Sequence, residues 1–163
     1  MLRVICIGNG LHGDDAVGET VFNELSNDAL PDNVELIDGG TAGMTLLPFF
    51  INCQHVLIVD LIKQAQGEEG QTVFYEDVFP LLPEIRYTGE EHGGDIVTLL
   101  NLLPHYTDAL PKVSLIGLTS SSRTTPFEGM SPQIAAGIDG LCEEIRCYIT
   151  QISNVMKSVE MTA

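Results

Sequence analysis

Three side chains that could share a metal ion lie far apart in the sequence but follow a common pattern. Asp15 comes after the apolar run 2–7, Asp60 directly follows the run 55–59, and His92 precedes a segment whose apolar residues have helical spacing. Because the ligands of an open α/β sheet bind at the carboxyl ends of its strands, these groups can converge in one crevice. Two carboxylates and an imidazole suit a borderline divalent metal ion. We therefore predict that Asp15, Asp60 and His92 are metal ligands.

The elements that would position these side chains alternate along the chain between strand and helix patterns. Strands are expected at 2–7, 34–37, 55–59, 71–75 and 112–118, and helices at 15–25, 44–50, 95–103 and 132 to about 156. Turn-forming residues predict irregular connections over 77–94 and 120–129. The pattern predicts an α/β fold, a three-layer α/β/α sandwich with a central, mostly parallel five-stranded sheet. We expect a single domain over 1–163, with a tail that frays from about residue 157.

An excess of acidic side chains limits the partners of this chain. Its 163 residues include 7 Lys and Arg against 23 Asp and Glu, a formal charge of −16 at pH 7. This charge repels nucleic acid and anionic membrane surfaces, so we expect neither as a partner. The amino terminus enters a strand without a secretory signal pattern, no apolar run reaches the length of a membrane span, and the four cysteines form no CxxC pair. We expect a monomeric, cytoplasmic protein with reduced thiols.

The first loop also fits a dinucleotide-binding fingerprint. A GxGxxG pattern follows the first strand and precedes a helix, in the segment Gly8-Asn9-Gly10-Leu11-His12-Gly13, and Asp38 ends the second strand. Against this alternative, Asp14 and Asp15 open the helix whose amides would receive the pyrophosphate. Unit charges about 4 Å apart repel by ~1 kcal/mol in water and ~4 kcal/mol near a protein surface. One aspartate suffices to cap the helix, so we assign Asp14 as the cap and Asp15 as the ligand.

Other polar groups support simpler interpretations. Asp60 alone could cap a turn, and His92 alone could be an exposed loop histidine. The other three histidines are expected to be structural or exposed: His12, His55 and His105. The serines at 120–122 lack a GxSxG elbow, and the absence of HExxH excludes a conventional zincin.

The segment from Gly8 to Gly18 resembles the amino-terminal signature GN-x-L-x-x-D-[DE]-x-x-G of the nickel-iron hydrogenase maturation endopeptidases. The segment 38–43 resembles their second motif, and Asp60 and His92 fall where that family has its other metal-binding positions. The resemblance extends from the first strand to about Pro132. It implies a protease that cuts a short C-terminal extension from the precursor of a hydrogenase large subunit after nickel insertion.

The resemblance also implies where the metal comes from. Nickel would arrive with the substrate, held by its thiolates, and Asp15, Asp60 and His92 would complete the shell and act as the catalytic residues. Zinc or cadmium could substitute for nickel in crystals. Whether nickel polarises the carbonyl, activates water or only anchors the substrate is left open, as is hydrolysis by aspartate-activated water. Backbone amides of Asp38, Gly39, Gly40 and Thr41 could grip an extended substrate, or these residues could simply form a tight turn. A noncatalytic chaperone or sensor of a nickel-loaded client is the alternative function.

Overall fold

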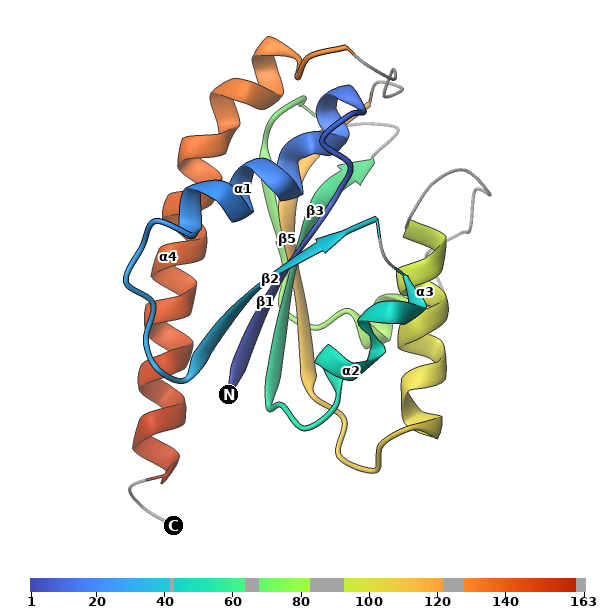
Figure 1. The fold of residues 1–163 in the computed structure, drawn as a ribbon, viewed down its shortest axis with the longest axis vertical. Helices are drawn as coiled ribbons and strands as arrows, with labels where there is room; N and C mark the ends of the chain where they lie inside the picture. The colour runs from blue at the N-terminus through green and yellow to red at the C-terminus, as the bar shows by residue number, and fades with distance from the viewer. Residues whose placement is uncertain (42, 64–67, 83–92, 122–127, 161–163) are drawn as a thin grey trace.

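A five-stranded sheet forms the middle layer of the molecule (Figure 1). This computed structural model describes residues 1–41, 43–63, 68–82, 93–121 and 128–160. The strands, in the order β2-β1-β3-β5-β4 across the sheet, are β2 (Val34–Gly40), β1 (Leu2–Ile7), β3 (His55–Lys63), β5 (Lys112–Ser120) and β4 (Thr72–Tyr75). Neighbouring strands are parallel except for β4, which pairs antiparallel with β5 at one edge. The predicted, mostly parallel sheet is confirmed.

Helices cover both faces of this sheet. The helical elements are η1 (Gly13–Ala16), α1 (Val17–Leu25), η2 (Met44–Leu46), α2 (Leu47–Phe50), η3 (Phe79–Leu81), α3 (Gly93–Leu102), η4 (Leu103–His105) and α4 (Pro132–Glu160). Figure 1 shows α1 and α4 on one side of the sheet and α2 and α3 on the other, which completes the three predicted layers. No helix in the described part of the chain is long and apolar enough to cross a membrane.

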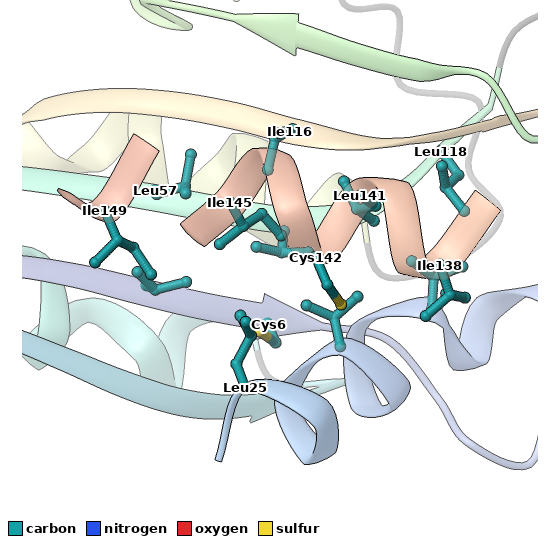
Figure 2. Packing of buried hydrophobic residues seen from close by; sticks show 14 of the residues in the cluster. Cys6, Leu25, Leu57, Ile116, Leu118, Ile138, Leu141, Cys142, Ile145 and Ile149 are labelled. Atoms are coloured by element: carbon teal, nitrogen blue, oxygen red, sulfur yellow. The ribbon is translucent and has the colours of Figure 1, made fainter. Parts of the chain in front are cut away.

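The two layers of core are aliphatic, and the α4 side is the larger. On α4 a buried stripe recurs at helical spacing and packs against the inner face of β3 and β5 (Figure 2): Ile138, Leu141, Cys142, Ile145 and Ile149 against Leu57, Ile116 and Leu118. Each fully buried aliphatic side chain contributes about 1.5–3 kcal/mol relative to its exposure in water. The central strands β1, β3 and β5 are buried on both faces, which explains why β3 reads as an almost continuous apolar run.

Several elements extend beyond their predicted ends. β3 continues past Asp60 and stays paired with β5 as far as Lys63 opposite Ser120, because the backbone ladder does not depend on the polar side chain of Asp60 and Leu61 is again buried. α4 continues to Glu160, past the expected end near Met156. The expected reduced thiols agree with the structure, since all four cysteines lie in its described part and none forms a disulfide.

Candidate active site

The loop after β1 folds back onto Asp15. The amide of Asn9 donates to the backbone oxygen of Asp15 at 3.0 Å and to its carboxylate Oδ2 at 3.0 Å. The amide of Asp15 in turn donates to the backbone oxygen of His12 at 3.0 Å. These bonds fix both the backbone and the carboxylate of Asp15 at the carboxyl end of β1.

Two glycines of the first motif are required by close backbone contacts. Gly8 has φ +154°, and a Cβ there would lie 2.2 Å from the backbone oxygen of Asp15. A Cβ at Gly18 would lie 2.0 Å from the backbone oxygen of Ile7. Any side chain at either position would push η1 and α1 away from the end of β1. The glycine spacing of the motif therefore lets Asp15 approach the sheet.

Asp14 has a different partner from the one expected. It lies inside η1 and is 6% exposed, and its Oδ1 accepts a hydrogen bond from the amide of Ser131 at 2.6 Å. The predicted role as cap of its own helix is wrong: in the described residues, no side chain caps η1 at His12 or α1 at Ala16. A capping residue stands before the helix with a non-helical backbone, whereas Asp14 is already within the first turn. Its carboxylate instead meets the amino-terminal end of α4, where a negative charge is favourable.

The sequence predicted that Asp60 follows the end of its strand, but the structure places it within β3. However, β1 pairs with β3 only as far as Cys6 opposite Val59, so Asp60 is the first residue of β3 beyond this paired segment, next to the carboxyl end of β1. On its other side it pairs with Gly117, where a Cβ would lie 1.8 Å from the backbone oxygen of Asp60. This places Asp60 at the same end of the sheet as η1, next to the carboxyl end of β1.

The electrostatics of Asp60 show that Asp15 is close to it. Burial, the larger cause, together with the negative charge of Asp15 raises the pKa of Asp60 from its usual 3.8 to about 7. A hydrogen bond from the amide of Leu61 to Asp60 Oδ1, at 2.7 Å, acts in the opposite direction. Asp15 and Asp60, which are distant in sequence, thus lie together at the carboxyl end of β1. Burial and mutual repulsion disfavour the state in which both carry a negative charge.

The third predicted ligand, His92, lies outside the described residues. Within the described residues, no group of three or more His, Cys, Asp or Glu side chains forms a metal-binding cluster. Asp15 and Asp60 are brought together, whereas the metal-binding and catalytic roles of Asp15, Asp60 and His92 remain predictions.

The second motif forms the irregular end of β2. Asp38, Gly39 and Gly40 belong to the strand, and Thr41 follows it, so the predicted loop begins later than expected. The register shifts here, with Cys6 opposite Asp38 and Ile7 opposite Gly40, and Gly40 has φ +50°. Asp38 Oδ1 accepts from the amide of Gly40 at 3.0 Å. The Gly40 amide is thus already bonded, and substrate binding by this segment remains a prediction.

The two motifs are joined in a way that argues against dinucleotide binding. The amide of Gly8 donates to the backbone oxygen of Gly40 at 2.9 Å, and the amide of Asn9 is bonded to Asp15. The first amides of the glycine loop therefore bind the protein itself, and the carboxylate of Asp15 lies where a pyrophosphate would approach. The strand order also differs from the 3-2-1-4-5-6 order of dinucleotide-binding folds.

The sequence interpretation missed two positions that shape this site. Ser131-Pro132 is a typical helix start, which could have indicated the beginning of α4 but not its bond to Asp14. Gly117 has no flanking motif, and only the strand pairing reveals why it must lack a side chain.

Comparison with known proteins assigns the family. A family model described as hydrogenase maturation protease matches residues 20–147. The chain belongs to the hydrogenase maturation protease family. It is similar to the hydrogenase 2 maturation protease of Escherichia coli (strain K12), with 32% identity over 148 residues that cover 88% of this chain and 87% of the relative. The hydrogenase expression/formation protein HupD of Rhodobacter capsulatus is 38% identical over 147 residues, covering 88% of this chain and 69% of HupD.

A solved structure of the family agrees with the fold. The hydrogenase maturating endopeptidase HybD from E. coli superimposes with a TM-score of 0.81 at 28% identity, covering 92% of both chains. As a member of this family the protein is a hydrolase of the protease class that acts in protein processing during hydrogenase maturation.

Proposed function

We propose that this protease is an endopeptidase that removes the C-terminal extension of a nickel-iron hydrogenase large-subunit precursor after nickel has been inserted. Family membership supports the reaction class. The observation that carries the rest is the approach of Asp15 to the partly buried Asp60 at the carboxyl end of β1. This is the edge of an α/β sheet at which ligands bind.

The two carboxylates repel each other when both are ionised, and a divalent cation between them would relieve this repulsion. Without a cation, burial and the charge of Asp15 keep the pKa of Asp60 near 7. A positive ion between them would replace repulsion by attraction and favour the ionised form of both. In the proposed reaction this ion is the nickel of the precursor, which Asp15, Asp60 and His92 would recognise from the protease side.

Recognition of the substrate's nickel would position the scissile segment. Nickel held by precursor thiolates and docked on the two carboxylates would bring the adjoining peptide next to the end of β1. The metal would then act as a Lewis acid toward the peptide carbonyl, or a carboxylate would take the proton from the attacking water. In either case, a precursor without nickel lacks the group that the site recognises.

The test is cleavage of a purified, nickel-loaded precursor, followed by mass spectrometry of the polypeptide. The wild-type protein should release a C-terminal peptide, and Asp15→Asn or Asp60→Asn should slow that release by about 10²-fold or more. Asp32→Asn, at an exposed aspartate before β2, is the matched control and should cleave normally. Processing at the wild-type rate by either active-site variant would contradict the assigned roles. Tight binding without a shortened product would instead favour a chaperone or sensor.

A further inference from the structure

The hydrogen bond between Asp14 and Ser131 joins the first motif to the start of the last helix. The two residues are 117 positions apart, and the bond from the Ser131 amide to Asp14 Oδ1 measures 2.6 Å. A bond from an amide to an ionised carboxylate is roughly twice as strong as a neutral one. Asp14 is 6% exposed, so this bond is largely shielded from water. Figure 1 shows η1 and the first turn of α4 at the same end of the sheet.

The short element that carries Asp15 needs such an anchor. η1 has four residues and leads directly into α1, and a turn of 3₁₀ helix has poorer hydrogen-bond geometry than the α-helix that follows it. From the β1 side, Asn9 and His12 hold the backbone of Asp15. Asp14 holds the same turn from the α4 side, one peptide bond away from Asp15.

We infer that Asp14 is a positioning residue, which keeps the carboxylate of Asp15 beside Asp60 by tying η1 to the start of α4. This inference rests on the proposed function, because it assigns to Asp14 a contribution to that reaction without contact with the substrate. A displacement of about 1 Å at a reacting group can lower a rate by roughly 10²-fold. The loss of one tether should therefore affect turnover more than stability or substrate affinity.

The chain offers a matched control for this tether. Arg146 of α4 donates through Nε to Asp28 Oδ2 at 2.7 Å, and Asp28 lies just after α1. This ion pair also joins the amino-terminal helix region to α4, but it lies at the other end of α1 from Asp15. Asp28→Ala removes a carboxylate tether between the same two parts of the chain without touching the first motif.

The experiment compares Asp14→Ala, Asp14→Asn and Asp28→Ala in the precursor cleavage assay. Asp14→Ala should lower kcat by about 10-fold or more with KM within about twofold of wild type, because the site is displaced while the docking surface is intact. Asp14→Asn keeps an oxygen that can accept from the Ser131 amide and should retain kcat within about threefold. Asp28→Ala should retain both constants.

Amide proton shifts of the free protein provide a readout that needs no precursor. Asp14→Ala should move the Ser131 amide upfield and also shift the Asn9 amide, which reports on Asp15. Asp28→Ala should change neither.

If the wild type fails to cleave, the proposed function is wrong, and the Asn9 shift still decides whether Asp14 positions Asp15. An unchanged Asn9 amide in Asp14→Ala, or equal kcat losses in Asp14→Ala and Asp28→Ala, would overturn the inference. A kcat loss in Asp14→Asn as large as in Asp14→Ala would overturn it as well, because the charge and not the hydrogen bond would then matter.

Discussion

Asp60 combines two features at the scale of a single residue, because its backbone belongs to a rigid strand while its carboxylate faces the first motif. The pairing of β3 with β5 on one side leaves little freedom at Asp60, and the end of β1 opens the other side. A ligand on a central strand is held more precisely than one on a loop. Asp15 sits on a single turn instead and depends on bonds from Asn9, His12 and, through Asp14, Ser131.

A cluster of polar side chains around the buried His55 lies at the amino-terminal ends of β3 and β5, opposite the end that carries Asp60. His55 Nε2 lies 2.9 Å from Ser114 Oγ and 2.8 Å from Tyr148 Oη, and Ser114 Oγ donates to the backbone oxygen of Glu76 at 2.6 Å. The rings of His55 and Tyr148 meet edge to face. This cluster joins β3, β5 and α4, so we interpret it as structural, in line with the sequence prediction for His55.

The His55 cluster predicts how stability depends on pH. Burial, the larger cause, together with the positive charge of Lys112 lowers the pKa of His55 from its usual 6.5 to about 4. Between pH 6.5 and pH 4 the unfolded chain binds a proton at His55 and the folded chain does not. The contribution of the neutral His55 to stability is therefore complete above pH 6.5 and is lost as the pH falls toward 4. Thermal unfolding at pH 7 and pH 5 should show a smaller loss of Tm in His55→Gln than in the wild type. His105→Gln, at an exposed position, is the control, and an unchanged pH response in His55→Gln would contradict this assignment.

At the scale of elements, the close approach of α1 to β1 makes a quantitative prediction. A Cβ at Gly18 would lie 2.0 Å from the Ile7 backbone oxygen, so Gly18→Ala should lower the free energy of unfolding by about 1–3 kcal/mol. Gly140 is also helical, but no described atom lies within 4 Å of a Cβ built there. Gly140→Ala should therefore raise the free energy of unfolding by about 0.5–1 kcal/mol. Urea unfolding of both variants checks the pair, and equal effects of the same sign would show that α1 does not pack as described.

The elements also show what the sequence could predict. Apolar periodicity identified the strands, the main helices and the layers, because burial on one or both faces dictates that pattern. The ends of β3 at Lys63 and β5 at Ser120 were not predictable, because polar residues such as Asp60 and Thr119 interrupt the apolar pattern while the backbone pairing continues. The approach of Asp15 to Asp60 followed from the rule for strand ends. The bond of Asp14 to Ser131 could not be predicted, because a capping residue and a tertiary anchor have the same residue type.

At the scale of the whole molecule, the cysteines are placed so that thiolates for nickel would have to come from the client. Cys6 and Cys142 are buried in the α4 side of the core (Figure 2), and burial raises the pKa of each thiol above its usual value. Burial also raises the pKa of the half-buried Cys53. Cys147 is exposed on α4, but about 22 Å along the helix from its first turn.

This arrangement predicts that nickel acts as a switch carried by the substrate. Two carboxylates and one imidazole without a thiolate should hold a free ion weakly, and the client's cysteines complete a strong site. The isolated protein should therefore purify largely free of nickel, and brief chelation before the assay should leave its cleavage of nickel-loaded precursor unchanged. Elemental analysis of the protein and mass spectrometry of the products measure both. Precursor that lacks nickel should remain uncut, and its cleavage at an undiminished rate would disprove nickel recognition even though the family assignment would stand.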